Sequence, residues 1–335
     1  MRLNFHTHFP RLVAITLIMC AIPSVTAIAG DKVNPQWQRC VLRAIDEFPF
    51  RGGYYTGSKP NATFSQTTWQ GLHRAFVMSL TDSRPHFLPH LAQPSFCSSA
   101  TYGVLIKALL MWDTKGKIST QAWRNMKPCV GIKDELNPTG LGQDDGVGFW
   151  GRANANGPSL AVLVRELDAG FSFSAYRGAL NDSVKETPSE RYLTDEQWRR
   201  HPVWKRAMRG DIMKIFWNRN ATKGHDGGAI IGYDGVRGHL QEAGHSVIFL
   251  GISTDGRVMY WSSNGPGSDP QHMGYSVGSC DPTAIQRVVF TRILRPERFD
   301  AVRHMAHDNV NRYLYDLNGT RHSSTSELKQ QIGEK

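Results

Sequence analysis

Residues 95–112 carry the pattern of a single amphipathic helix, and a cysteine stands near its start. Apolar side chains recur at positions 100, 104, 105, 108, 109 and 112, which is the spacing of one helix face. Ser95 stands where an N-cap residue is expected. The backbone dipole and the unpaired amides of a helix N-terminus favour a thiolate. The pattern therefore predicts a helix with one buried face that presents Cys97 as a nucleophile.

Helical patterns occupy the first half of the chain and strand-like runs the second. The helical patterns cover residues 36–48, 68–80, 120–126 and 159–167, with loops expected at 84–90 and 137–158. Runs rich in β-branched and aromatic residues cover residues 211–217, 246–252, 257–262 and 288–294. Asp255-Gly256 predicts a tight hairpin between the two middle runs. This order predicts an α+β fold with an antiparallel sheet.

The two ends of the chain differ from its centre. Arg2 and Arg11 flank an apolar run over residues 12–22, and Ala27-Ile28-Ala29 follows as a small-residue cleavage site. These features predict a signal peptide over residues 1–29, cleaved near Ala29, and a secreted or periplasmic protein. The apolar run is short for a membrane span, and no later stretch is long and apolar enough for one. The polar tail from about residue 319 is typical of a disordered segment.

The chain is basic, with 39 Lys and Arg against 29 Asp and Glu, a formal net charge of +10. Residues 1–29 hold two basic and no acidic residues, so cleavage lowers the net charge to +8. A basic exported protein suits an anionic polymer such as a cell envelope. No dense Lys/Arg run with interleaved aromatic residues is present, so we expect no nucleic-acid partner.

Four cysteines remain after cleavage, and the sequence leaves their pairing open. They are Cys40, Cys97, Cys129 and Cys280. An even number in an oxidising compartment favours two disulfides. The position of Cys97 favours the other interpretation, in which Cys97 is free, two of the remaining three pair, and one is left over.

Two strand ends supply partners for a nucleophilic Cys97. A thiolate mechanism needs an imidazole as base and acid, and a polar group that orients the imidazole. His245 follows Gly244 at the start of one strand-like run, and the next run ends in Ser262-Ser263-Asn264. The tight hairpin places these two strand ends side by side.

Three sequence blocks, in order, resemble the NlpC-like branch of the papain-fold cysteine peptidases, which also includes CHAP-type amidases. They are Phe96-Cys97-Ser98-Ser99, the run from Gly210-Asp211 to Trp217, and the run from Gly244-His245 to Gly251. The resemblance implies a papain-like fold, with the nucleophile-bearing helix packed on an antiparallel sheet and an added N-terminal helical segment. It also implies Cys97 as nucleophile, His245 as base and acid, and a third polar residue on the following strand.

Asn264 is the expected third residue, because an Asn side chain can accept a hydrogen bond from the imidazole N–H and fix its tautomer. Ser262 and Ser263 are close competitors. Gln93 is a candidate oxyanion donor together with the Cys97 backbone N–H. Arg152 and Asn154 are candidate substrate-binding residues, although a solvated loop is an equal interpretation of both.

The resemblance and the signal peptide together divide the chain into four expected segments. These are a signal peptide at 1–29, an N-terminal helical extension at 30–90, a papain-like catalytic domain at 91–296, and a C-terminal helix with a polar tail at 297–335. We expect neither a metal nor a cofactor, because the acidic pair Asp144-Asp145 lacks the ligand spacing of a known calcium loop.

The expected function is that of an exported cysteine peptidase or amidase that hydrolyses amide bonds in peptidoglycan stem peptides or crosslinks. The substrate follows from the resemblance, the export signal and the basic charge, and from no pocket residue. One alternative is an acyltransferase or transglutaminase-like reaction through the same acyl-enzyme. Another is a non-catalytic secreted binding domain in which Cys97 forms a disulfide. The sequence identifies neither the bond cleaved nor any protein inhibitor.

Overall fold

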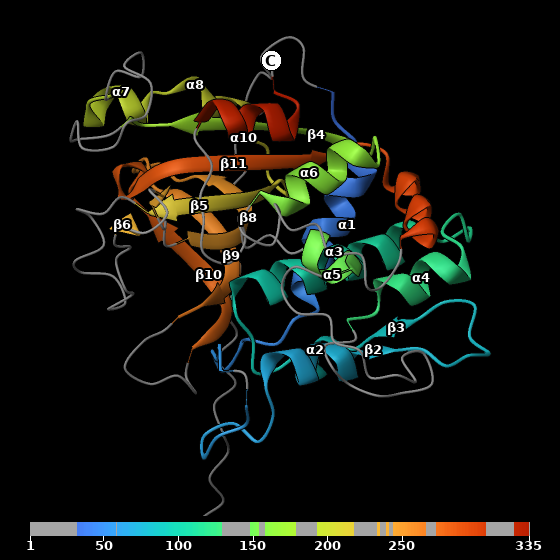
Figure 1. Cartoon of the computed structure of the whole chain (residues 1–335). Helices are drawn as coiled ribbons and strands as arrows, with labels where there is room; N and C mark the ends of the chain where they lie inside the picture. Colours follow the sequence, from blue (N-terminus) through green and yellow to red (C-terminus); the bar gives the residue numbers. More distant parts are fainter. Residues whose placement is uncertain are drawn as a thin grey trace, which may run out of the picture.

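In the protein, helices pack against an antiparallel sheet (Figure 1). The structure is a computed structural model that describes residues 32–57, 59–128, 148–153, 158–178, 193–217, 233–234, 239–240, 244–265, 273–305 and 325–334. The predicted α+β class is confirmed. The predicted signal peptide over residues 1–29 lies outside the described residues, as do Cys129 and the Asp144-Asp145 pair.

Among the described residues, the main sheet has seven strands in the order β1-β10-β9-β8-β5-β11-β4, and all neighbouring strands are antiparallel. The strands of this sheet are β1 (Arg51–Gly52), β4 (Gly170–Tyr176), β5 (Ile212–Trp217), β8 (Gly244–Ile252), β9 (Val258–Asn264), β10 (Gly274–Cys280) and β11 (Ile285–Ile293). Two small hairpins pair β2 (Phe76–Val77) with β3 (His86–Phe87), and β6 (Tyr233–Asp234) with β7 (His239–Leu240).

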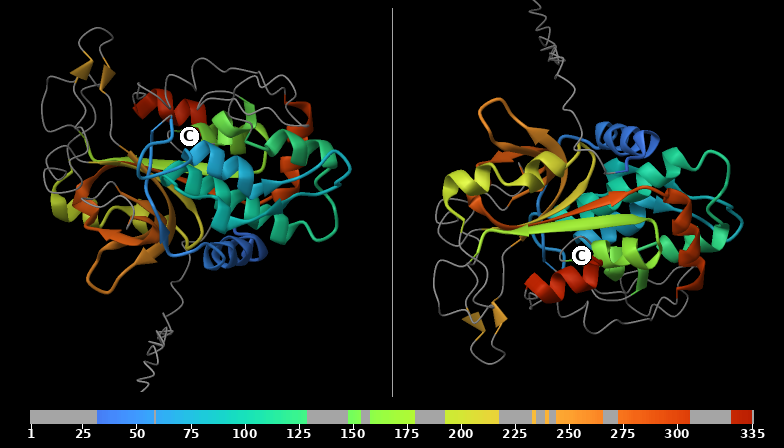
Figure 2. Two further views of the ribbon diagram at one scale, coloured as in Figure 1. Left: turned by 90° about the horizontal axis from the view of Figure 1, so that it is seen from below. Right: turned by 90° about the horizontal axis from the view of Figure 1, so that it is seen from above.

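The helices of the first half of the chain lie beside one part of the sheet (Figure 2). The α-helices are α1 (Pro35–Asp46), α2 (Thr68–Ala75), α3 (Cys97–Trp112), α4 (Thr120–Met126), α5 (Gly148–Ala153), α6 (Ser159–Glu166), α7 (Asp195–Arg199), α8 (Pro202–Arg206) and α10 (Thr325–Ile332). Within the described residues, the 3₁₀ segments are η1 (Pro89–Leu91), η4 (Pro282–Ala284) and η5 (Pro296–His304).

Local capping explains where several of these helices begin. Asn34 accepts a hydrogen bond from the Trp37 N–H (3.0 Å) directly before α1. Thr67 and Gln70 form a capping box at the start of α2. Ser119 caps α4 by accepting from the backbone N–H of the third helical residue (3.3 Å). These signals are local in sequence, which is why the predicted starts at 36, 68 and 120 lie within one residue of the observed ones.

The sheet has an apolar core on each face. On one face, α3 packs against β8 and β9, and α1 packs against α3. The strands contribute Ile212, Ile248, Trp261, Tyr275 and Ile293 to this core. Alternate strand residues point to the opposite face, as the two-residue period of a strand requires.

The second core lies under α7 and α8. Met213, Val247 and Phe249 pack there with Trp198 of α7 and Trp204 of α8. The side chains of β5 and β8 therefore alternate between the α3 face and the α7–α8 face of the sheet.

Helix α3 is buried on nearly all sides, so the prediction of an amphipathic helix with one buried face is wrong. Lys107 and Met111 are its only residues that are not buried. The helix begins at Cys97, which makes Phe96 rather than Ser95 the N-cap residue. Ser95 instead donates its hydroxyl hydrogen bond to the hydroxyl of Ser263 on β9 (2.8 Å). The Ser95 side chain, which was expected to cap the helix, therefore links the start of α3 to the sheet.

The hairpin between β8 and β9 is confirmed. Ser253 and Arg257 close the turn through a backbone hydrogen bond (2.9 Å), and Gly256 has φ +81°. This φ lies in the left-handed region that glycine adopts without strain. In the register, Ile248 lies opposite Trp261. Beyond this pair, the side chains of His245 and Asn264 still meet, with Nε2 2.8 Å from Oδ1.

Four local expectations were wrong. The loop expected at 84–90 contains β3 and η1, and the loop expected at 137–158 contains α5. Strands β4 and β10 were not predicted. Residues 325–332 form α10 rather than a disordered tail, because Leu328 and Ile332 are buried against Val162 of α6.

Candidate active site

Cys97 lies at the N-terminus of α3 with only 6% of its surface exposed. The first turn is held by Ser99, whose hydroxyl accepts from the Phe96 N–H (2.9 Å) and donates to the Phe96 carbonyl (2.8 Å). The Cys97 N–H belongs to the first turn, where helical amides have no carbonyl partner within the helix. The sulfur therefore lies at the positive end of the helix dipole.

His245 lies near the start of β8 and is 8% exposed. Its ring stacks on Trp217 with centroids 6.1 Å apart, and Tyr260 meets it edge-on at 5.5 Å. These two aromatic rings limit the movement of the imidazole. The His245 side chain forms a hydrogen bond with the Cys97 thiol.

Asn264 orients the imidazole from the end of β9. Its Oδ1 is 2.8 Å from His245 Nε2. Its Nδ2 donates to the Ser276 carbonyl (3.0 Å) and to the Ser276 hydroxyl (2.9 Å). Because the amide nitrogen is engaged with Ser276 on β10, the amide oxygen is the atom that faces the ring.

This arrangement determines the roles of the two ring nitrogens. A hydrogen on Nε2 is donated to Asn264, so Nδ1 is the nitrogen that is left for the Cys97 thiol. In the neutral ring Nδ1 is then an acceptor, and it can take the proton of the thiol. The imidazole of His245 thus lies between the thiol of Cys97 and the side-chain amide of Asn264.

The electrostatics of the site favour the thiolate. Burial alone raises the pKa of Cys97, but the hydrogen bond and the charge of His245 lower it. The charge of Lys214 and the backbone N–H of Ser246 lower the pKa further, and its net value is about 7 rather than 9. A thiol with this pKa is about half ionised at neutral pH.

The two serines that competed with Asn264 have other partners. Ser262 donates to the Ser246 carbonyl (2.6 Å), and Ser263 accepts from Ser95 (2.8 Å). Of the three polar residues at the end of β9, Asn264 is the one whose hydrogen bond reaches His245.

The Gly210-Asp211 block, one of the three on which the resemblance rests, stabilises the fold through a buried ion pair of Asp211. Both oxygens of Asp211 accept hydrogen bonds from Arg292 of β11, at 2.9 and 2.8 Å. The two side chains are 1% and 2% exposed. Asp211 also caps the preceding turn by accepting from the Met208 N–H (2.8 Å). Loss of one partner of such a buried pair is strongly destabilising.

The other candidate residues lie elsewhere or outside the described chain. The side chain of Gln93 packs against Gly52 of β1, and no hydrogen bond joins it to Cys97 among the described residues. Arg152 pairs with Glu166 between α5 and α6. Asn154 lies outside the described residues. The structure therefore brings together Cys97, His245 and Asn264, whereas the partner that it gives Arg152 is Glu166.

The disulfides that both hypotheses expected are contradicted, whereas the free Cys97 of the second hypothesis is confirmed. Cys40, Cys97 and Cys280 are buried free thiols. Neither two disulfides nor one pair among Cys40, Cys129 and Cys280 is compatible with this result. Burial raises the pKa of Cys40, and it raises the pKa of Cys280 to about 12. Cys97 differs from these two cysteines because its pKa is lowered.

Two residues around the site were missed in the sequence. Lys214 is the only charged residue within β5. A single lysine in an otherwise apolar run was visible in the sequence and could have drawn attention to this position. Ser276 lies on β10, whose sequence was not recognised as a strand, so no local signal placed it beside Asn264.

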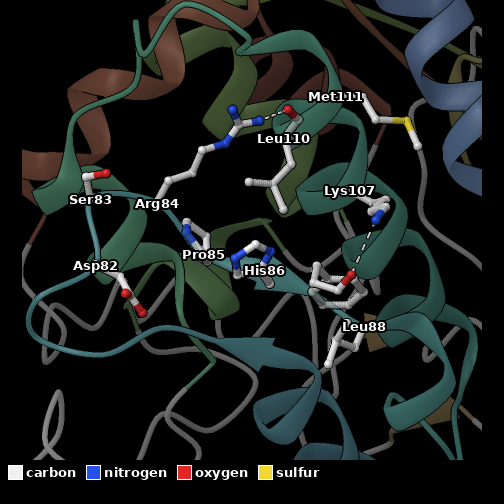
Figure 3. Close-up of a pocket in the computed structure, with 10 residues that line it drawn as sticks. Asp82, Ser83, Arg84, Pro85, His86, Leu88, Lys107, Leu110 and Met111 are labelled. Atoms are coloured by element: carbon white, nitrogen blue, oxygen red, sulfur yellow. Dashed lines mark hydrogen bonds between the residues drawn. The ribbon is translucent and has the colours of Figure 1, made fainter.

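A separate cavity of about 540 Å³ lies at the other end of α3 (Figure 3). Its cationic walls have partners within the protein, because Arg84 donates to the Leu110 carbonyl and Lys107 pairs with Glu47 (2.6 Å). From α3, Lys107, Leu110 and Met111 line it, ten or more positions along the helix from Cys97. It is therefore not the cleft of the Cys97 site.

No known protein family, curated protein or solved structure matches the chain. Within the described ranges, no helix is both long and apolar enough to cross a membrane. Within the same residues, no three His, Cys, Asp or Glu side chains gather as metal ligands would.

Proposed function

We propose that this protein is an exported cysteine peptidase or amidase that hydrolyses amide bonds with Cys97, His245 and Asn264. The observation that carries the proposal is the position of His245, which is hydrogen-bonded both to the Cys97 thiol and to Asn264. A disulfide-bonded cysteine would have no thiol that could lose a proton to an imidazole. The free thiol of Cys97 also supports the proposal over the alternative in which this residue is disulfide-bonded.

The reaction begins with proton transfer from Cys97 to His245. The thiolate attacks the carbonyl carbon of the amide, and the charge on the oxygen is stabilised by the Cys97 N–H at the start of α3. The C–N bond then breaks, and the imidazolium gives its proton to the leaving amine. A thioester remains on Cys97.

Hydrolysis of the thioester completes the cycle. Neutral His245 removes a proton from water, and the resulting hydroxide attacks the thioester carbon. The C–S bond breaks, a carboxylic acid leaves, and the thiol is regenerated. Asn264 holds the ring in one orientation through both halves of the reaction.

Peptidoglycan stem peptides or crosslinks are the proposed substrate, and a papain-like arrangement is the proposed fold. The support for both is the ordered resemblance of the blocks at Cys97, Gly210-Asp211 and Gly244-His245. The net charge of +8 that remains after the expected cleavage also suits an anionic wall polymer. The pattern of residues 1–29 supports export to the compartment where that polymer lies.

The test is the release of soluble peptides from purified peptidoglycan, together with the appearance of new amino groups. The Cys97→Ser variant should fold with the wild-type thermal midpoint and release nothing. Release of peptides by the Ser variant at the wild-type rate would contradict the proposal. It would also be contradicted if the wild-type protein cleaved no amide bond although its Cys97 reacted with iodoacetamide.

The same assay separates hydrolysis from acyl transfer. With an added primary amine, a hydrolase yields mainly the free carboxylic acid, whereas a transferase yields mainly the new amide. Mass spectrometry distinguishes the two products.

A further inference from the structure

Strand β10 has an outer edge that is paired over only part of its length. Its inner edge pairs with β9 from Gly274 to Cys280, whereas β1 pairs with Gly274 and Tyr275 alone. Within the described residues, no strand pairs with the outer edge beyond Tyr275. An unpaired edge exposes backbone N–H and C=O groups, and it can therefore bind a further strand.

Two hydrogen bonds show which way the backbone groups of β10 point. The Met273 carbonyl accepts from the Gly53 N–H, on the side of β1 (2.8 Å). The Ser276 carbonyl accepts from the Asn264 side chain, on the side of β9 (3.0 Å). Successive residues of an antiparallel strand direct these groups to alternate sides. The N–H and C=O of Val277 therefore point to the outer edge, beyond the end of β1.

Two exposed apolar side chains lie at this part of the edge. Phe50 is 71% exposed and Val277 is 58% exposed, the highest values among the large apolar residues that the structure describes. Arg51 lies opposite Tyr275, so Phe50 and Val277 each lie within two residues of that pair. Exposed apolar side chains that gather beside an unpaired edge favour the binding of another chain.

A cation lies on each side of Val277 along one face of the strand. Arg51 lies opposite position 275, with its guanidinium carbon 5.0 Å from the centre of the Phe50 ring. Arg257 reaches Ser279, where its Nε donates to the hydroxyl (3.0 Å) and its Nη2 to the carbonyl (3.2 Å). Positions 275, 277 and 279 share a face because strand side chains alternate. The edge therefore presents cation, apolar group and cation at intervals of two residues.

Both arginines keep their charge available to a partner. Within the described residues, neither forms an ion pair with a carboxylate. Asp255 shares a turn with Arg257, but its carboxylate accepts from the Ser253 hydroxyl. Arg51 also has φ +69°, a left-handed conformation that is costly for a residue other than glycine and that clusters in ligand-binding segments.

We propose that the outer edge of β10 binds an extended, acidic peptide segment of a partner protein as an added strand. The segment pairs with the N–H and C=O of Val277. It carries an apolar residue between two acidic residues, with one residue separating each from the next, because alternate residues of a strand share a face. The apolar side chain contacts Val277 and Phe50, and the carboxylates meet Arg51 and Arg257. The inference goes beyond the proposed function, since this edge takes no part in the reaction at Cys97.

A second copy of the chain fits this edge less well than an acidic segment does. Antiparallel pairing of two copies around Val277 places position 275 of each copy opposite position 279 of the other. Arg51 of one copy then faces Arg257 of the other, and like charges that face each other across strands are destabilising. The basic net charge of the chain also opposes association of two copies.

The test uses fluorescence anisotropy with a labelled seven-residue peptide, acetylated and amidated at its ends. Glutamate, valine and glutamate occupy its second, fourth and sixth positions, and threonine fills the others. The protein is the full chain with Cys97→Ser, so that cleavage cannot consume the peptide. Binding should saturate, and a peptide with lysine in place of both glutamates should bind at least about tenfold more weakly. In Arg51→Glu this preference should fall by about fivefold or more.

Two substitutions of Val277 test the strand pairing. Val277→Pro removes the outward N–H, which an edge strand tolerates, and should weaken binding about tenfold. Val277→Asp keeps the N–H but repels the glutamates, and it should weaken binding at least as much. Leu80→Asp is the matched control, because it places the same charge at another exposed apolar residue (52% exposed), in the segment between β2 and β3. It should leave the affinity unchanged.

Equal affinities for the acidic and basic peptides would overturn the proposal, as would wild-type affinity in Val277→Asp or no saturation up to about 1 mM peptide. If the Pro variant does not fold, Val277→Asp decides. A dimer in sedimentation that dissociates in Val277→Asp would show a second copy at this edge and would also overturn the proposal. Peptide binding requires no amide cleavage, so failure of the proposed function would leave this result distinct.

Discussion

Replacement of Asn264 by Ala tests whether the amide orients His245. The substitution removes the acceptor that lies 2.8 Å from Nε2. It also leaves the Ser276 carbonyl and hydroxyl without the amide that now donates to both. Trp217 and Tyr260 still contact the ring in the variant, so the imidazole keeps part of its position.

The expected loss follows from the lost hydrogen bond. A hydrogen bond to a group that becomes charged contributes about 1.5–3 kcal/mol. Because 1.36 kcal/mol corresponds to a factor of ten in rate, turnover should fall roughly ten- to a hundred-fold. The loss should be smaller than that in Cys97→Ser, since Asn264 only orients a group that carries out the chemistry.

Ser262→Ala is the matched control on the same strand and the same face. Ser262 is fully buried and donates to the Ser246 carbonyl (2.6 Å). Its loss should lower the free energy of unfolding by about 1 kcal/mol and leave turnover close to that of the wild-type protein. Turnover on peptidoglycan and urea unfolding are measured for both variants.

The reasoning is refuted if Asn264→Ala turns over at the wild-type rate, or if Ser262→Ala loses activity and Asn264→Ala does not. The second outcome would mean that the strand register around His245 differs from the one inferred here. Cys97 reactivity toward iodoacetamide provides an independent measure, because a misoriented imidazole supports the thiolate less well.

Three further outcomes follow from the same site. Iodoacetamide should label Cys97 with a pH midpoint near 7 and Cys40 and Cys280 far more slowly, as mass spectrometry of the labelled peptides would show. In His245→Ala the midpoint should move upward toward 9, because the largest pKa-lowering partner is lost, and turnover should fall by about 10²–10⁴; coincident pH profiles would contradict this. Ser98→Ala should leave stability unchanged or raise it by about 1 kcal/mol in urea unfolding, since its buried hydroxyl has no hydrogen-bond partner among the described residues. A clear loss of stability would show that the hydroxyl has a partner in solution.

The helix and the hairpin of the site could be predicted because their signals are local. The run that begins at Cys97 has helical spacing, and the Asp255-Gly256 turn fixes the strands on both sides of it. Once the hairpin is assumed, the approach of the Gly244-His245 end to Asn264 follows from antiparallel pairing. These three steps need no information from the rest of the chain.

The surroundings of the site could not be predicted because they depend on distant pairing. Strand β10 is Gly274-Tyr275-Ser276-Val277-Gly278-Ser279-Cys280, whose glycines and serines give no strand signal. It becomes a strand because it pairs with β9 along its whole length. Ser276, which fixes the Asn264 amide, could not be identified before that pairing was known.

The sequence contained a signal that α3 is buried on nearly all sides, although the amphipathic spacing of its apolar residues suggested one buried face. Lys107 is the only charged residue among positions 97–112, whereas a helix with one exposed face carries several. The helix is covered by α1 on one side and by β8 and β9 on another. The Cys97 thiol at its N-terminus is therefore held by an element that is packed on several sides.

The segment expected as an N-terminal extension helps to build the site. Strand β1 places Gly52 opposite Gly274 on β10, and the Gly53 carbonyl accepts from the Ser95 N–H (3.1 Å) just before the Cys97 helix. The Ser95 carbonyl in turn accepts from the Tyr55 N–H (3.0 Å), and its hydroxyl donates to Ser263 on β9. Residues 51–55 thus join the start of α3 to the strand that carries Ser276. The position of Cys97 relative to Asn264 therefore depends in part on residues 51–55, which belong to the segment expected as an extension.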